Sequence, residues 1–167
     1  MNKYIDFIIL LLVGVLIGFN IFVTFILTPQ LFSHFDHRLA GEITNLIFPF
    51  YFASGWIVGI VIYTLIALQS IKDKLIVKRL KGFVIGLTVV ILLYMAEHRT
   101  LLPMGQAANS QYYQLIDEGE KEKAKVFKER FKTIHAVSST INIINLLLLI
   151  YLFYAYLSKK EEKEQIK

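Results

Sequence analysis

Residues 7–28 read FIILLLVGVLIGFNIFVTFILT, an apolar stretch without a single charged side chain. A helix rises about 1.5 Å per residue, so about 20 residues cross the roughly 30 Å hydrocarbon layer of a bilayer. This stretch is therefore long enough to span a membrane. It is too long for the apolar region of a signal peptide, and no small-residue cleavage site follows it. We interpret it as a retained membrane span.

Three more stretches of this kind follow, at about 46–68, 80–102 and 133–157. The composition agrees, with 56% hydrophobic residues, 19% charged residues and a mean hydropathy of +0.56. Soluble domains are rarely so apolar. The sequence predicts an all-α integral membrane four-helix bundle, with one transmembrane domain over residues 1–158 and a charged cytoplasmic tail over 159–167.

The connections between the spans carry their own patterns. Pro29, Pro49 and Pro103 stand near the ends of apolar stretches and are expected to mark helix boundaries, with Pro103 ending the third span. Residues 31–45 repeat apolar side chains at helical spacing, which predicts a short interfacial helix between spans 1 and 2. An apolar stripe in the charged segment 120–132 predicts that the fourth helix begins several turns before its span.

Lys and Arg counts favour an orientation with both termini in the cytoplasm. The inner segments would then hold 10 of the 18 basic residues, and the short first loop on the outer side would hold only Arg38. Short loops carry the most weight in this rule. We expect a protein of the cytoplasmic (inner) membrane. Its lysines lie beside apolar stretches, where they anchor lipid headgroups, so the lipid bilayer and not nucleic acid is the expected partner.

Several kinds of chemistry find no support in the sequence. The chain has no cysteine, which excludes disulfides, thiolate metal sites and cysteine nucleophiles. Phosphate-binding glycine loops, zinc-protease motifs and dinucleotide fingerprints are absent from the sequence. Ser138 and Ser139 share a helix with His135 but lack a nucleophile elbow, so a hydrolase is not expected, nor is any other enzyme predicted.

Glycine pairs of the GxxxG type occur in three spans, at Gly14 and Gly18, Gly55 and Gly59, and Gly82 and Gly86. Such pairs let helix backbones approach closely in lipid. They favour a compact monomeric bundle, with an oligomer interface or the general abundance of glycine in membrane helices as alternatives.

Polar residues inside the spans are the candidate site, because polar groups in hydrocarbon tend to face protein or water. Glu97 falls on the glycine face of the third span and should point into the bundle, whereas Arg99 should point away. The fourth span carries a polar stripe. The candidate ligand-binding residues are Glu97, His135, Asn142, Ser138, Ser139 and Asn20.

Two interpretations of this group stay open. Imidazole and carboxylate are competent ligands, so His135, Glu97 and His98 are candidates for binding a transition metal, a haem or a cationic solute. Alternatively, the polar residues form interhelical hydrogen bonds that set helix register. His34 and His37 are spaced to chelate but are expected to be solvated.

Three segments together resemble the transmembrane protein 205-like family of four-span membrane proteins. They are FVTFILTPQLFSHFDHRLAGEITNLIFPFYF at residues 22–52, EHRTLLPMG at 97–105 and FKTIHAVSSTINIINL at 131–146. Where that family commonly has Glu-Pro-Arg-Thr, this chain has His98 in place of the proline. The resemblance implies the four-span architecture without an activity. A more distant similarity to the copper-resistance D group implies metal or haem handling by analogy only.

Two functional hypotheses follow. In the first, an outward-facing polar vestibule built around Glu97, His135 and Asn142 binds or passes a small cationic solute, metal or haem. In the second, the protein is an accessory or scaffolding subunit of a larger membrane complex, with partner membrane subunits and a purely structural polar cluster.

Overall fold

The computed structural model describes the backbone of residues 3–165 and the side chains of residues 3–158. Every regular element in this part of the chain is helical, and four of its helices are long and apolar enough to cross a membrane. They span Lys3–His34, His37–Lys72, Lys81–Asp117 and Lys121–Ser158. The all-α four-helix prediction is confirmed. The protein is a membrane protein by the length and composition of these helices.

The first of these long helices consists of α1 (Lys3–Ile21), a π-helical turn η1 (Phe22–Leu27) and α2 (Thr28–His34). The second is α3 (His37–Lys72), which is followed by the short α4 (Ile76–Arg79). The third consists of α5 (Lys81–Ala96), a second π-helical turn η2 (Glu97–Leu101) and α6 (Leu102–Asp117). The fourth is α7 (Lys121–Gln165), which begins well before its apolar span, as expected.

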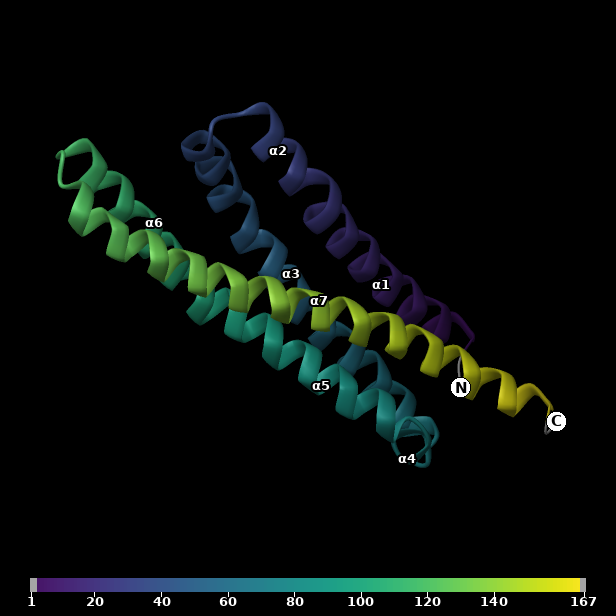
Figure 1. Ribbon diagram of the computed structural model, residues 1–167. Coiled ribbons are helices and arrows are strands. Elements are labelled where there is room, and N and C mark those ends of the chain that lie inside the picture. Colours follow the sequence, from purple (N-terminus) through teal and green to yellow (C-terminus); the bar gives the residue numbers. More distant parts are fainter. Residues whose placement is uncertain (1–2, 166–167) are drawn as a thin grey trace.

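The helices pack as an elongated bundle. α1 contacts α3 and α7, and α5 contacts the same two helices, so α3 and α7 hold the bundle together. α6 and the first half of α7 form a hairpin that projects past the other helices (Figure 1). Both chain ends and the 73–80 connection lie at one end of the bundle, here called the terminal end (Figure 1). The opposite end, with the 35–36 and 118–120 turns, is called the vestibule end.

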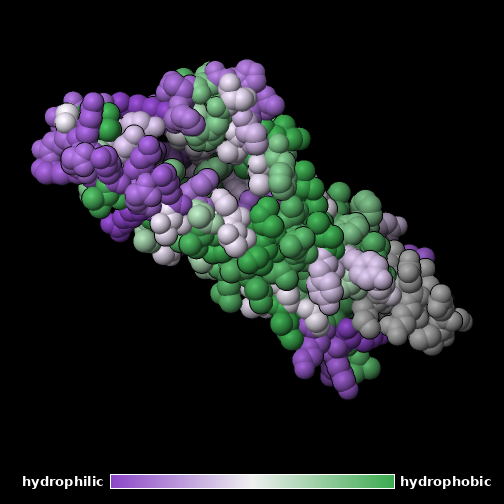
Figure 2. All heavy atoms as spheres, in the orientation of Figure 1, coloured by the Kyte–Doolittle hydropathy of each residue, from purple (hydrophilic) through white to green (hydrophobic). Residues whose placement is uncertain are grey.

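On the face shown in Figure 2, apolar residues form a band across the middle of the bundle, and polar residues gather at the vestibule end and around the 73–80 connection. Large apolar side chains in the band are exposed, for example Leu92 at 60% and Leu147 at 61%. Water would penalise such exposure, whereas lipid tails accept it. Inside the band, the apolar side chains that pack the core include Ile9, Val13, Ile62, Leu87, Leu149 and Leu152.

The expectation that the prolines mark helix ends is wrong. Pro49 lies inside α3, and Pro29 and Pro103 open helices that continue from the π-helical turns before them. A proline lacks an N–H, and its ring clashes with the carbonyl four residues earlier. For Pro29 and Pro103, the carbonyl four residues earlier lies in η1 and η2, where the helical turn is wider. In η1 the Thr28 N–H bonds to Val23 O, and in η2 the Leu102 N–H bonds to Glu97 O. The widened turns let both helices pass through proline.

The expected interfacial helix over residues 31–45 is not a separate element between two spans. Residues 31–34 end α2, and residues 37–45 are the first turns of α3. The break lies at Asp36, whose carboxylate accepts hydrogen bonds from the backbone N–H groups of Arg38 and Leu39 at 3.0 and 3.1 Å. This N-cap lets α3 start with only two residues between it and the end of α2. The apolar periodicity over residues 31–45 therefore comes from the end of α2 and the start of α3.

The α6–α7 turn depends on one glycine. Gly119 adopts a φ of +80°, a conformation that costs other residues free energy. The backbone N–H of Glu120 bonds back to Leu115 O at 2.9 Å and so closes a Schellman motif. The turn aligns α6 with the start of α7, and the two together form one wall of the vestibule described below.

Candidate functional site

Polar side chains from all four long helices meet in the half of the bundle nearer the vestibule end. They form two neighbouring groups on successive turns of α7, called here the Asn142 cluster and the Glu97 cluster. The Asn142 cluster consists of Asn20, Thr24, Tyr51, Tyr94 and Asn142. The Glu97 cluster consists of Glu97, Ser138 and Asn145.

Asn142 connects α7 to three segments of the first two long helices. Its Nδ2 donates to Thr24 Oγ1 at 2.7 Å, and its Oδ1 accepts from Asn20 Nδ2 at 3.0 Å and from Tyr51 Oη at 2.6 Å. Asn20 Nδ2 also lies 3.3 Å from Tyr94 Oη on α5. Every polar atom of the Asn142 amide group therefore has a partner, and the partners come from α1, η1 and α3.

Glu97 is completely buried, with 0% of its surface exposed. It is the first residue of η2, so the widened turn before Pro103 determines where its side chain points. Oε1 accepts from Ser138 Oγ at 3.3 Å, and Oε2 accepts from Asn145 Nδ2 at 3.2 Å. Both partners are neutral. π-helical turns often occur at functional sites because they re-aim one side chain in this way.

Asn145 adds a second unusual feature to the Glu97 cluster. It is completely buried, and its Oδ1 has no hydrogen-bond partner among the described residues. A buried carbonyl oxygen without a partner costs about 1–3 kcal/mol. An orphaned oxygen beside a buried carboxylate is an arrangement that a cation or a water molecule would satisfy.

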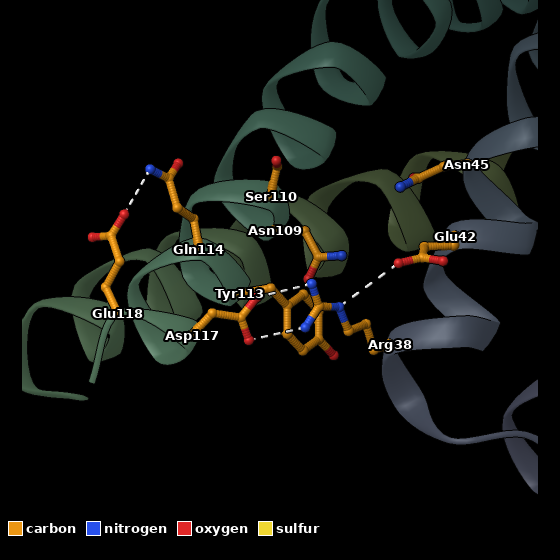
Figure 3. Close-up of a pocket in the computed structure, with 9 residues that line it drawn as sticks. All are labelled: Arg38, Glu42, Asn45, Asn109, Ser110, Tyr113, Gln114, Asp117 and Glu118. Carbon is orange, nitrogen blue, oxygen red and sulfur yellow. Dashed lines mark hydrogen bonds and ion pairs between the residues drawn. The ribbon is translucent and has the colours of Figure 1, made fainter. Parts of the chain in front are cut away.

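A vestibule of two adjoining pockets leads towards this cluster. The mouth pocket, of about 430 Å³, lies between the start of α3 and the end of α6 (Figure 3). The deep pocket, of about 90 Å³, adjoins it at Asn45 and Asn109, which line both. Ser138 lines the deep pocket and donates to Glu97. Figure 2 shows the surface hollowed between the polar ends of α2–α3 and α6–α7.

The mouth pocket carries more negative than positive charge. Its ionisable side chains other than Tyr113 are three carboxylates, of Glu42, Asp117 and Glu118, and the guanidinium of Arg38. Arg38 crosses from α3 to α6, where both its terminal nitrogens bond to Asp117 at 3.0 Å (Figure 3). The guanidinium also lies over the Tyr113 ring, 5.2 Å from its centroid. The excess of carboxylates favours cations at the mouth.

The structure brings four of the six predicted ligand-binding residues into these clusters and leaves two outside. Glu97 and Ser138 contact each other, and Asn20 and Asn142 contact each other. His135 is exposed, stacks on Phe131 with ring centroids 5.9 Å apart, and lines the deep pocket. Ser139 is exposed and belongs to neither cluster.

The three residues predicted to bind a metal have different surroundings. His98 Nδ1 accepts a hydrogen bond from Trp56 Nε1 at 3.3 Å, whereas Glu97 faces α7 and His135 lies against Phe131. Over residues 3–158, no group of three or more metal-ligating side chains converges. The deep pocket is also far below the 300–1,000 Å³ typical of sites for larger ligands. The described structure therefore does not bring these three residues together as one set of ligands, and metal or haem binding stays a prediction.

Sequence reasoning missed the tyrosines. Tyr51 stands near the end of a span, where aromatic residues usually lie at the membrane surface, but it is 2% exposed and bonds to Asn142. Tyr94, 1% exposed, lies three residues before Glu97 and so on the same helix face, a signal that could have identified it. A separate buried group at the terminal end, Asp6, Gln69 and Tyr156, was also missed.

Comparison with known proteins places the chain in one family. A family model for a domain of unknown function, DUF4149, matches residues 11–114, more than half of the 167-residue chain. No curated protein and no solved structure matches it. The relationship to the transmembrane protein 205-like family and the copper-resistance D group stays a prediction. The chain belongs to the DUF4149 family of domains of unknown function.

Proposed function

We propose that this membrane protein binds a small monovalent cation, a proton or an alkali ion, at Glu97, and that the cation enters through the vestibule. The observation that carries the proposal is the surroundings of Glu97. Its carboxylate is fully buried. Among the described residues it bonds only to the neutral side chains of Ser138 and Asn145, and the Asn145 Oδ1 that finds no partner there lies in the same cluster.

The electrostatic argument starts from the cost of the charge. An acidic side chain at the centre of a membrane helix costs roughly 2.5–3.5 kcal/mol on insertion scales, and such residues usually mark ion or proton pathways. Glu97 has no cationic partner among the described residues. Its charge is neutralised either by protonation or by a bound cation. In both cases a positive charge must reach it from outside the bundle.

The vestibule supplies the route. Mouth carboxylates concentrate cations, and the polar wall of Asn45, Asn109 and Gln106 continues into the deep pocket. Ser138 lies between that pocket and Glu97, and its hydroxyl donates a hydrogen bond to the Glu97 carboxylate. A volume of about 90 Å³ accommodates a small ion with a few water molecules.

The orientation completes the proposal. With both termini in the cytoplasm, as the distribution of Lys and Arg favours, the vestibule opens on the outer side of the cytoplasmic membrane. The transmembrane domain over residues 1–158 then receives its cation from outside the cell. The chain binds the ion, or passes it on, with Glu97 as the central ligand and Ser138 and Asn145 as supporting oxygens.

Carbodiimide labelling tests the proposal in the full-length protein purified in mild detergent. Dicyclohexylcarbodiimide modifies protonated carboxyl groups in apolar surroundings, and mass spectrometry of peptides identifies the labelled residue. We expect labelling of Glu97 that Na⁺ slows severalfold if the ligand is an alkali ion, with the bulkier cation choline as the control without effect. Labelling at neutral pH that ignores Na⁺ identifies the proton, because the reagent requires a carboxyl group that still carries its proton. No labelling of Glu97 at neutral pH, with or without Na⁺, contradicts the proposal.

Two variants sharpen the test. Glu97→Gln should lose the label while keeping its fold, because the amide oxygen still accepts a hydrogen bond and carries no charge. The matched control is Glu122→Gln, whose carboxylate is 85% exposed near the start of α7 and should leave labelling of Glu97 unchanged. If Glu122→Gln abolished the label as well, the labelling would not report on the buried site.

The alternative function is that of an accessory or scaffolding subunit, and the Asn142 cluster is the observation that favours it. The Asn142 side chain is fully bonded and connects α7 to three other helical segments, which is what a purely structural cluster requires. In that case affinity purification in mild detergent should recover a stoichiometric membrane partner.

A further inference from the structure

A second buried carboxylate lies near the terminal end of the bundle, away from the vestibule. Asp6 is 2% exposed and receives two hydrogen bonds on Oδ1, from Gln69 Nε2 at 2.8 Å and from Tyr156 Oη at 3.0 Å. The three residues come from α1, α3 and α7. Gln69 is 5% exposed and Tyr156 is completely buried. We call this group the Asp6 cluster.

The Asp6 cluster contains more acceptors than donors. Both hydrogen bonds reach the same carboxylate oxygen, and Gln69 Oε1 is buried without a partner among the described residues. The two hydrogen bonds that described side chains donate to Asp6 leave its Oδ2 free to bind a further ligand. A carboxylate that is 2% exposed, beside an orphaned amide oxygen, resembles the arrangement in the Glu97 cluster with different residues.

Positive side chains nearby do not neutralise Asp6 within the described structure. Lys3 on α1 and Lys72 on α3 are exposed, as are Lys78 and Arg79 of α4 and Lys81 at the start of α5. The ion pairs formed by the described side chains leave Asp6 out. The partners that Asp6 does have, Gln69 and Tyr156, are neutral hydrogen-bond donors.

We infer that the Asp6 cluster is a site for an alkali ion, loaded from the terminal end. Its oxygen ligands are Asp6 Oδ2 and Gln69 Oε1, with Tyr156 holding the carboxylate in place. Carboxylate and amide oxygens are ligands that hard cations prefer. This inference stands on the Asp6 cluster alone and does not require Glu97 to bind anything.

An apolar layer separates the two sites. On α7, Tyr156 lies eleven residues after Asn145, a rise of about 16 Å along the helix. Between them, Leu149 and Leu152 are completely buried against a core that includes Ile62, Leu87 and Val13. A polar path through this layer is missing from the described structure, so each site exchanges its cation with its own side of the membrane.

The same carbodiimide experiment tests this site because each carboxylate lies on its own peptide. In the purified full-length protein, we expect labelling of Asp6 to be slowed severalfold by Na⁺ and left unchanged by choline. Gln69→Leu removes the orphaned oxygen and should raise the Na⁺ concentration that gives half-protection at Asp6 by tenfold or more. Labelling of Glu97 in that variant should match the wild type.

Two results would overturn the inference. One is an Asp6 peptide in the wild type that is labelled equally with and without Na⁺. The other is an Asp6 that is never labelled across the Na⁺ and pH range, which would mean that the chain itself neutralises it permanently. Because Asp6 and Glu97 are measured separately, the failure of one site does not decide the other.

Discussion

Gly55 in α3 packs directly beneath the ring of Tyr94 in α5. A Cβ added at Gly55 would lie closer than 3.0 Å to three atoms of that ring. The ring cannot retreat easily, because Tyr94 is 1% exposed, lies edge-on to Tyr51 and carries the hydroxyl that meets Asn20. The close approach of two backbones at this glycine thus positions a member of the Asn142 cluster.

Replacing Gly55 with alanine should destabilise the bundle by about 1–3 kcal/mol, the usual cost of inserting a methyl group into a packed core. The free energy of unfolding in mixed detergent micelles measures the effect. The matched control is Gly82→Ala, because no atom lies within 4 Å of a Cβ built at Gly82. Equal stabilities of the two variants would show that the α3–α5 contact is not tight.

Asn142→Leu should lower the unfolding free energy by about 2 kcal/mol, because it removes three interhelical hydrogen bonds at about 0.6 kcal/mol each. It also leaves Asn20 and Tyr51 with one partner fewer. Ser139→Ala, three residues earlier on the exposed side of α7, should change the unfolding free energy by less than about 0.5 kcal/mol. An unaffected Asn142→Leu protein would mean that the cluster does not hold the helices together.

The Arg38–Asp117 ion pair should restrain the vestibule mouth, since it joins the start of α3 to the end of α6. In Asp117→Asn we expect faster reaction of a charged thiol reagent with a cysteine placed at Asn109, which lines both pockets. Raising the salt concentration should speed the same reaction in the parent protein, because salt screens exposed ion pairs.

The control for this measurement is Glu129→Gln, which breaks an ion pair with Lys132 within α7 alone. It should leave the reaction rate at position 109 unchanged. If Asp117→Asn and Glu129→Gln behave alike, the ion pair between α3 and α6 does not limit access to the vestibule.

Much of the fold was predictable because the spans are longer and more apolar than a soluble core requires. The burial of Glu97 also followed from helix geometry, which placed it on the face of Gly86. Helix ends were harder to predict. Proline usually ends a helix, but here η1 and η2 widen the turns before Pro29 and Pro103, and a single-sequence pattern does not reveal a π-helical turn.

The glycine pairs were predicted with partial success. Gly55 and Gly59 both lie in tight contact, against Tyr94 and Ile91, and Gly86 contacts Leu152. Gly18 and Gly82 have no atom within 4 Å of a built Cβ. A GxxxG spacing indicates that another helix can pack closely against this one. Which glycine is contacted depends on where the neighbouring helix lies. That information lies in tertiary packing and not in the spacing.

The sequence predicted many of the residues that form the site, but fewer of the contacts that they make. Ser138, Asn142 and Asn145 share one face of α7, so their convergence followed from helical periodicity. His135 belongs to the same stripe, but it lies at the edge of the deep pocket against Phe131, where the hairpin of α6 and α7 leaves it exposed. The tyrosines were missed because aromatic residues near a span end are usually interfacial.

The most direct test of the central claim is the accessibility of Ser138 from water. The chain has no cysteine, so Ser138→Cys introduces a unique thiol at the floor of the vestibule. In proteoliposomes or whole cells, small membrane-impermeant thiosulfonates of opposite charge are applied from the outer side. Ile144→Cys, on an exposed face of α7 within the expected span, provides the lipid-facing control.

The account predicts that the cationic reagent modifies Ser138→Cys from the outside, that it does so faster than the anionic reagent of similar size, and that Ile144→Cys stays unmodified. A thiol at position 138 that reacts with neither reagent from the outer side would contradict it. So would a thiol that reacts faster with the anionic reagent, because the vestibule would then not deliver cations to Glu97.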